Sequence, residues 1–345
     1  MVVEPVQVAV TGASGYIALH VIAELLDAGY AVRGTLRDMA RGDSVRAALS
    51  RQTETSNLSF VQCDLMSDGG WDAAFAGCQY VHHIASPLPI AEPKDHDDLI
   101  IPARDGALRA LGAAARAGVK RVVITSSVAA IGYGQKGKED FTEADWSNVE
   151  ADIGAYAASK TLAERAAWDF MKTLPDGGTD IAAMELVTIN PSLVIGPLID
   201  PDGSASIELV RKLLAREVPG CPKFGICLVD VRDVAAAHVT AMTSPRAPGN
   251  RYICSTEFRW MAQLAEQLNN DFGPMGYPVS TRVLPNFVVR LVGLFDAAVG
   301  RIVPELGQRK NYINDAIRKD LNWQTRAMDL TVRETGESLL ALKVV

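Results

Sequence analysis

The chain has 345 residues, of which 48% are hydrophobic and 22% are charged, and this balance excludes a disordered or fibrous protein. Its 34 basic and 41 acidic side chains give a net charge of −7. That charge argues against nucleic-acid or anionic-membrane partners, because both require clustered Lys and Arg. No apolar run reaches the roughly 20 residues that span a bilayer, since even 287–299 contains Arg290 and Asp296. We therefore expect a globular chain that binds neither nucleic acid nor membrane.

The cysteines and the N-terminal residues indicate in which cellular compartment the protein is expected. The five cysteines are odd in number and none are spaced as CxxC: Cys63, Cys78, Cys221, Cys227 and Cys254. This pattern favours reduced thiols over a disulfide framework or a zinc site. A strand-like run begins by residue 6, without the basic region and apolar core of a secretory signal. The sequence therefore predicts a cytoplasmic protein.

The first half of the chain alternates short β-branched runs with longer helical patterns. The expected strands are 6–10, 31–36, 58–62, 80–84 and 121–125, with two more at 181–189 and near 226–229. The helical patterns lie near 15–28, 40–50, 98–117 and 152–174, the last with Asp152 as its N-cap. This alternation is typical of a parallel sheet with helices on both faces. Right-handed crossovers then favour a doubly wound α/β sheet of the Rossmann type.

The composition changes after about residue 190, where Pro and Gly punctuate shorter segments. We interpret 1–190 as a dinucleotide-binding domain, completed by a late strand and helix near 226–242. Residues 191–345 are then expected to form a smaller substrate-binding lobe over the carboxyl edge of the sheet.

The first strand leads directly into a glycine-containing segment, Thr11–Ala18, and a helical pattern follows at once. Gly12 permits a tight turn, Gly15 lets the backbone approach a pyrophosphate, and Ala18 lets the helix lie close to the strand. Amides at the helix start would hold the phosphates. The predicted cofactor contacts here are Thr11, Gly12, Ser14, Gly15, Tyr16 and Ile17. The alternative is a glycine turn without a ligand.

The end of the second strand distinguishes the two nicotinamide dinucleotides, because a carboxylate there binds a ribose hydroxyl and an arginine accepts a 2′-phosphate. Arg37 stands at that end, beside the small residues Gly34 and Thr35. We therefore predict NADP(H) as the cofactor. The alternative is that Arg37 is a solvated charge and Asp38 binds the ribose.

The third and fourth strands also end in residues suited to a dinucleotide. Asp64 and Leu65 follow the third strand, where an adenine ring would lie, although an aspartate that only caps a turn fits almost as well. Small residues after the fourth strand suit a wall against the cofactor: Ile84, Ala85 and Ser86. His82 and His83 precede them, but neighbouring strand residues point to opposite faces and lack further ligands at metal spacing. We expect no metal site.

Tyr156 and Lys160 are four residues apart in a helical pattern, so they share one helix face. An ammonium beside a phenol favours the phenolate and is expected to lower the pKa of Tyr156. Such a phenol can give a proton to a carbonyl oxygen while hydride reaches the carbon. The alternative is an ordinary helix with a packed tyrosine and a solvated lysine.

Hydroxyl groups end the strand at 121–125, at the edge where ligands bind in open α/β sheets. Ser127 is predicted to donate a hydrogen bond to the substrate oxygen, with Ser126 as the alternative. A serine hydrolase is disfavoured, because no Gly-x-Ser-x-Gly sequence surrounds either serine.

Together these motifs resemble the extended branch of the short-chain dehydrogenase/reductase family: Thr11–Ala18, Ser127 and Tyr156–Lys160. Four further segments resemble its dihydroflavonol reductase and cinnamoyl-CoA reductase group, which includes microbial aldehyde and ketone reductases: 30–38, 82–87, 118–127 and 190–197. The resemblance covers roughly residues 5–240.

That resemblance implies reversible, NADPH-dependent reduction of a carbonyl, with Tyr156 as the general acid and Ser127 polarising the substrate. It also implies that Lys160 holds the nicotinamide ribose, that Arg37 binds the 2′-phosphate, and that the backbone of 191–194 meets the nicotinamide. The residues predicted in that last segment are Pro191, Leu193 and Val194.

One residue departs from the family pattern. Many relatives carry an asparagine in the helix before the serine strand, where it supports a water-mediated proton path from the lysine. Arg109 occupies the matching sequence position. We expect Lys160 to exchange protons by another route.

The lobe after residue 190 is rich in apolar side chains, so an apolar or aromatic carbonyl substrate is expected, acted on by a monomer or homodimer. One alternative is a nucleotide-sugar epimerase or dehydratase of the same fold. It is disfavoured because 128–130 lack the acidic pair of dehydratases and because Arg37 indicates the phosphorylated cofactor. A second alternative, a non-catalytic NADP-binding regulator, is disfavoured by the intact tyrosine–lysine pair.

Overall fold

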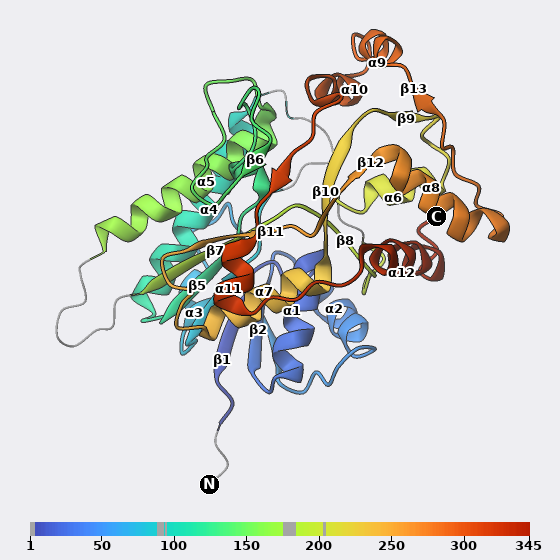
Figure 1. Cartoon of the computed structure of the whole chain (residues 1–345). Coiled ribbons are helices and arrows are strands. Elements are labelled where there is room, and N and C mark those ends of the chain that lie inside the picture. Colours follow the sequence, from blue (N-terminus) through green and yellow to red (C-terminus); the bar gives the residue numbers. More distant parts are fainter. Residues whose placement is uncertain (1–3, 88–92, 94, 175–183, 203–204) are drawn as a thin grey trace.

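The computed structural model describes residues 4–345 apart from 88–92, 94, 175–183 and 203–204. Its centre is a seven-stranded sheet in which every neighbouring pair is parallel (Figure 1). From one edge to the other the order is β3 (Leu58–Gln62), β2 (Ala31–Leu36), β1 (Gln7–Val10), β4 (Tyr80–His83), β5 (Arg121–Thr125), β7 (Glu185–Pro191) and β11 (Arg251–Cys254). The chain runs outward from β1 in both directions, so the predicted doubly wound Rossmann-type sheet is confirmed.

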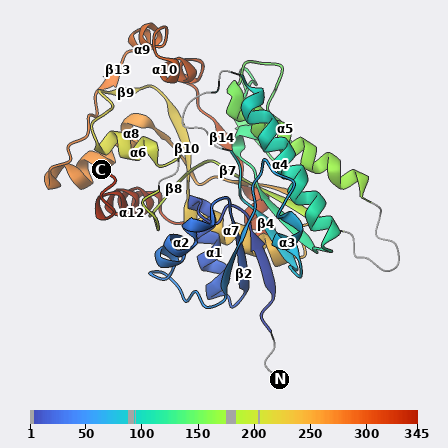
Figure 2. The same ribbon diagram turned by 180° about the vertical axis from the view of Figure 1, so that it is seen from behind.

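Helices cover both faces of this sheet (Figures 1 and 2). One face carries α1 (Tyr16–Asp27), α2 (Gly42–Leu49) and α7 (Val231–Thr243); the other carries α3 (Trp71–Phe75), α4 (Asp97–Arg116) and α5 (Gly154–Thr173). Val8 and Val10 pack into the first layer and Ala9 into the second. Successive side chains of a strand point to opposite faces, so the continuous apolar run in β1 serves both layers.

Much of the remaining chain gathers in a smaller lobe above the carboxyl edge of the sheet, whereas α11 (Asp315–Leu321) packs against α7 and β11 (Figure 1). The three-stranded sheet of this lobe has the order β12 (Glu257–Trp260), β10 (Gly225–Asp230) and β8 (Leu193–Ile195). Two short pairs join distant segments: β13 (Val283–Leu284) with β9 (Cys221–Pro222), and β14 (Asn311–Tyr312) with β6 (Asp140–Phe141). The remaining helices are α6 (Glu208–Leu214), α8 (Met261–Phe272), α9 (Asn286–Val292), α10 (Ala297–Ile302) and α12 (Met328–Ala341).

The structure corrects two details of the predicted domain. The strand expected near 226–229 is β10, but it pairs with β8 and β12 instead of completing the large sheet. The seventh position belongs to β11, while the expected helix, α7, does cover the sheet. Helix α5 begins at Gly154 with Ile153 as its N-cap, so Asp152 does not cap it.

The sequence analysis expected reduced cysteines, no membrane span and no metal site. All five cysteines are free and buried. No helix within the described residues has the length and apolar character needed to cross a membrane. His82 and His83 face opposite ways, with His82 Nδ1 at 3.4 Å from His238 Nδ1 and His83 Nδ1 at 3.0 Å from Thr11 Oγ1. In the part of the chain that the structure describes, no cluster of three or more His, Cys, Asp or Glu could hold a metal ion.

Candidate active site

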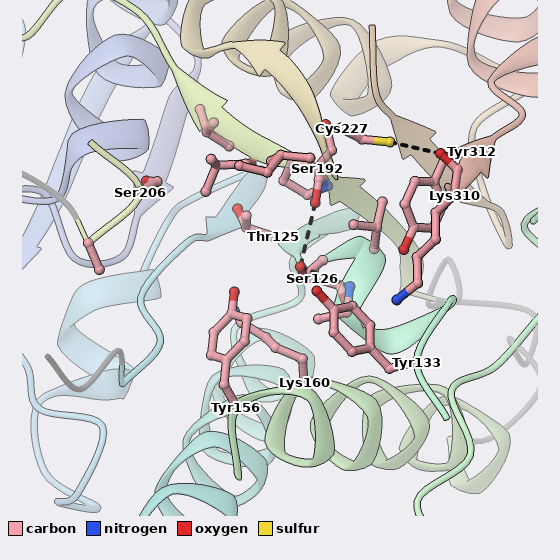
Figure 3. A pocket seen from close by; sticks show the side chains of 18 of the residues that line it. Thr125, Ser126, Tyr133, Tyr156, Lys160, Ser192, Ser206, Cys227, Lys310 and Tyr312 are labelled. Carbon is pink, nitrogen blue, oxygen red and sulfur yellow. Dashed lines mark hydrogen bonds between the residues drawn. The ribbon is translucent and has the colours of Figure 1, made fainter. Parts of the chain in front are cut away.

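The carboxyl ends of the central strands and the smaller lobe enclose a cavity of about 510 Å³ (Figure 3), a size typical of small-molecule sites. Nine of the predicted site residues line it: Ile17, Ile84, Ser86, Ser127, Tyr156, Lys160, Pro191, Leu193 and Val194. The other predicted residues lie outside this cavity: Thr11, Gly12, Ser14, Gly15, Tyr16, Arg37, Asp64, Leu65 and Ala85. The structure thus gathers the proposed chemical groups and the nicotinamide end of the predicted cofactor site.

The two glycines of the loop lie too close to their neighbours for larger residues to fit easily. Gly12 has φ +69°, and a Cβ there would lie 3.0 Å from the Cβ and 3.1 Å from the Cα of Ala85. A Cβ on Gly15 would lie 3.1 Å from the Gly12 carbonyl oxygen, which accepts the Gly15 amide at 2.8 Å. The tight loop leads into the first turn of α1, where backbone N–H groups lack helical acceptors. This arrangement fits a pyrophosphate.

Thr11 and Tyr16 were predicted to contact the cofactor, but their side chains form hydrogen bonds within the protein. Thr11 Oγ1 accepts the amides of Ile84 and Ala85, both at 3.0 Å, so its own proton is available to His83 Nδ1. Buried Thr11 thereby ties the loop to the end of β4. The hydroxyl of Tyr16 donates to the Gly196 carbonyl at 2.9 Å, which leaves only the backbone of Tyr16 for a phosphate.

At the end of β2 the charged side chains have distinct partners. Asp38 accepts the Ala40 amide at 3.0 Å and caps a short 3₁₀ turn, and Arg41 forms an ion pair with Asp202 at 2.6 Å. Arg37 is exposed, and its guanidinium makes no hydrogen bond or ion pair within the described chain. Of these three side chains, Arg37 is the one left available for a 2′-phosphate.

The residues after β3 are occupied with local structure. The carboxylate of Asp64 accepts the Met66 amide at 2.9 Å, which is the turn-capping role weighed against adenine binding. Leu65 packs against α4, where a Cβ on Gly106 would lie only 2.7 Å from its Cδ2. Whether either residue meets the adenine stays a prediction.

Arg109, at the position where many relatives carry an asparagine, is bonded elsewhere. Its guanidinium turns away from Lys160, to Asp68 at 2.5 Å and to the Leu65 carbonyl at 2.9 Å. Two alanines of α4, Ala103 and Ala107, instead line a cavity of about 20 Å³ beside Lys160. This space is room for about one water. The sequence alone does not show which residues of α4 face Lys160, because that depends on how α4 packs on α5.

Tyr156 and Lys160 project from one face of α5 into the main cavity, as Figure 3 shows. Lys160 Nζ lies 6.0 Å from the centroid of the Tyr156 ring. Ser127 follows β5, accepts the Ala129 amide at 3.1 Å and donates to the Pro191 carbonyl at 3.5 Å. Two elements, α5 and the end of β5, therefore bring a phenol, an ammonium and a hydroxyl into one cavity.

Burial controls the acid–base character of this group. It raises the pKa of Tyr156, while a hydrogen bond with Ser127 opposes that rise. Burial also lowers the pKa of Lys160 to about 8, and the charge of Glu164 opposes that shift. The pKa of Tyr156 thus shifts in the direction opposite to the one expected from Lys160, because loss of water around the phenol has the larger effect.

A buried hydrogen-bond network distinguishes the roles of the two candidate serines, Ser126 and Ser127. Ser126 Oγ donates to Glu164 Oε2 at 2.5 Å, and Asn190 Nδ2 donates to the same oxygen at 2.7 Å. Arg251 Nε donates to Glu164 Oε1 at 2.5 Å. Ser126 is thus committed to the carboxylate, so the geometry favours Ser127 as the substrate-facing hydroxyl. Sequence analysis missed Glu164, although its spacing one turn beyond Lys160 was a signal.

The sequence analysis also did not predict one group of residues that line the cavity. The group consists of residues that lie far apart in the chain: Tyr133, Phe258, Glu305, Lys310 and Tyr312. No motif in the sequence marks these residues. Pairing of β14 with β6 and of β12 with β10 places them around the site.

Comparison with known proteins assigns the chain to a family. The profile of the NAD dependent epimerase/dehydratase family matches residues 8–254. The chain belongs to this family. Cinnamoyl-CoA reductase 1 of Arabidopsis thaliana is 36% identical over 283 residues, which cover 80% of this chain and 77% of the relative. A bifunctional dihydroflavonol 4-reductase/flavanone 4-reductase of Malus domestica is 31% identical, with 80% and 79% covered.

Solved structures extend the similarity to nearly the whole chain. Yeast methylglyoxal/isovaleraldehyde reductase Gre2 complexed with NADPH superimposes with a TM-score of 0.80 at 26% identity, covering 98% of this chain and 99% of that one. UDP-glucose 4-epimerase of Thermotoga maritima, at 19% identity and a TM-score of 0.72, shares the fold. The resemblance to the extended short-chain dehydrogenase/reductase family and its reductase group is confirmed.

Proposed function

We propose that this chain reduces an aldehyde or ketone to the alcohol with NADPH. Its relatives make it an oxidoreductase with a nicotinamide cofactor. The observation that carries the reaction is the meeting of Tyr156, Ser127 and Lys160 in one buried cavity beside the glycine loop. A panel of aldehydes and ketones, with NADPH oxidation followed by absorbance, tests the proposal. Absence of turnover across the panel would refute it.

The residues around the cavity fit the cofactor. The glycine loop and the start of α1 would hold the pyrophosphate, and Arg37 would hold the 2′-phosphate. Ile17 and Ile84 would lie against the nicotinamide end, opposite the backbone of 191–194. NADPH supplies the hydride that reaches the carbonyl carbon.

The remaining chemistry belongs to the side chains. The Tyr156 hydroxyl gives its proton to the carbonyl oxygen, which becomes the alcohol, as hydride adds to the carbon. Ser127 donates a hydrogen bond to the same oxygen and orients it. The Lys160 ammonium stabilises the phenolate left behind, which then recovers a proton from solvent. The reverse sequence oxidises the alcohol.

The two rival functions have less support. Ser127 is followed by the buried apolar residues Val128, Ala129 and Ala130, which supply no acid for elimination. A sensor without turnover does not require a phenol, an ammonium and a hydroxyl in one cavity. Net consumption of added NADPH by simple aldehydes would exclude an epimerase that recycles its cofactor, and also a silent regulator.

Arg37→Ala is expected to raise the Kd for NADPH by about 10- to 100-fold, because a charge-assisted hydrogen bond to the 2′-phosphate is lost. Binding of NADH, which lacks that phosphate, should hardly change. Fluorescence titration with both cofactors measures the difference. Arg41→Ala is the matched control, since Arg41 is paired with Asp202. Equal weakening for both cofactors would contradict the assignment.

The pH dependence of reduction should report Lys160. Its pKa is lowered to about 8, so the ammonium is present below that pH and is lost above it. The kcat/KM for an aldehyde at saturating NADPH should be level below pH 8 and fall about tenfold per pH unit well above it. Because burial raises the pKa of Tyr156, a fall that begins only above pH 10 would assign the limb to the phenol instead.

A further inference from the structure

Lys310 and Glu305 form an ion pair in the wall of the cavity, and the proposed reaction does not use it. Lys310 Nζ lies 2.8 Å from a carboxylate oxygen of Glu305, and both residues line the cavity. The same ammonium lies 3.9 Å from the centroid of the Tyr133 ring. Figure 3 shows Lys310 extending beside Tyr312, with its amino group towards Tyr133. The pair therefore faces the space in which a substrate would be held.

The position of Lys310 is fixed by its surroundings. Tyr312, two residues further on, belongs to β14, which pairs with β6. Cys227 of β10 donates its thiol to the Lys310 carbonyl at 3.2 Å. The Lys310 side chain is only 15% exposed and the Glu305 side chain 24%. A half-buried lysine with an anchored backbone differs from a surface lysine, whose flexibility makes its contacts weak.

The chemistry of the pair favours one kind of substrate group. A neutral hydroxyl can accept a hydrogen bond from the ammonium and donate one to the carboxylate. A substrate carboxylate would gain attraction from Lys310 but meet repulsion from Glu305 next to it. A methyl group would displace water from both charges and replace none of its hydrogen bonds.

The geometry points to a carbonyl substrate that carries, besides the reacting carbonyl, a neutral hydroxyl group selected by Lys310 and Glu305. This inference rests on the proposed function and makes the substrate more specific than an apolar or aromatic carbonyl compound. The aromatic residues Tyr133, Phe258 and Tyr312 line the same cavity and would contact the apolar body of the substrate.

The test compares three end groups on one aldehyde: benzaldehyde, 4-(hydroxymethyl)benzaldehyde and 4-formylbenzoate. The same end groups on straight-chain aldehydes of increasing length allow for the reach from Tyr156. We expect the hydroxyl compound of the matching length to have a kcat/KM about tenfold above the unsubstituted one. The carboxylate should fall below the unsubstituted compound.

Substitutions of Lys310 and Glu305 test whether this ion pair sets the order of kcat/KM among the three end groups. Lys310→Met should bring the hydroxyl and unsubstituted compounds to within about twofold of each other. Glu305→Gln leaves the Lys310 charge without its counter-ion, so the carboxylate should become the preferred end group. Arg309→Gln is the matched control: Arg309 lies over the Phe258 ring at 5.2 Å and does not line the cavity. Titration with NADPH checks that each variant is folded.

The outcomes separate this inference from the proposed function. Equal kcat/KM for the three end groups at every length, or an unchanged order in both Lys310→Met and Glu305→Gln, would overturn the role of the pair while carbonyl reduction stands. If no carbonyl compound consumes NADPH, the proposed function itself fails.

Discussion

Replacing Tyr156 by Phe is expected to lower kcat by about 10³-fold while the chain still binds NADPH. The substitution removes one oxygen from a buried side chain and deletes the general acid, whose contribution is commonly about 10²- to 10⁴-fold. Without that proton, hydride transfer would leave an alkoxide with no positioned acid to protonate it. Stopped-flow and steady-state NADPH oxidation measure the loss, and titration with NADPH checks binding.

Tyr133→Phe is the matched control for this prediction. Tyr133 is a second phenol on the wall of the same cavity, and burial raises its pKa above the usual value. It should cost less than about tenfold in kcat, because Tyr133 lies against Lys310, whereas Tyr156 is the phenol that shares a helix face with Lys160 and a hydrogen bond with Ser127. Comparable losses in the two variants, or an active Tyr156→Phe enzyme, would remove Tyr156 from its role.

Local patterns explain why much of the fold could be predicted. Strands β1 to β5 are short apolar runs separated by helical patterns, and a run such as Val8 to Val10 faces helices on both sides. The pairing of β10 is different. Its sequence indicates a strand, but the choice of β8 and β12 as partners depends on where β7 ends, at Pro191. Strand identity is local, whereas partner choice is tertiary.

The same distinction applies to the site. Tyr156 and Lys160 were predictable because four residues along a helix place two side chains on one face. Their pKa values were not, since burial depends on the lobe that closes over them. Lys310 and Glu305 carry no local signal at all. Their place in the cavity follows from the β14–β6 pairing, which joins segments far apart in the chain.

Glu164→Ala is expected to lower the free energy of unfolding by about 3–5 kcal/mol, which is typical when one partner of a buried ion pair is removed. The Glu164 and Arg251 side chains are 1% and 9% exposed. The alanine would leave the guanidinium without its counter-ion and Ser126 without its acceptor, and Asn190 would keep only the Ser127 carbonyl as an acceptor. Urea denaturation measures the change. Glu164→Gln keeps an acceptor oxygen and should lose less, so equal losses in both variants would contradict a role for hydrogen-bond geometry.

This network also connects stability to the chemistry, because Glu164 lies one turn beyond Lys160 on α5 and its charge raises the pKa of that lysine. Glu164→Gln should therefore move the alkaline limb of kcat/KM below pH 8, even where the variant is fully folded. A double variant, Glu164→Leu with Arg251→Met, replaces the charged pair by apolar groups and should recover part of the lost stability, yet keep the shifted limb. Recovery of the limb together with stability would show instead that Glu164 acts only by holding α5 in place.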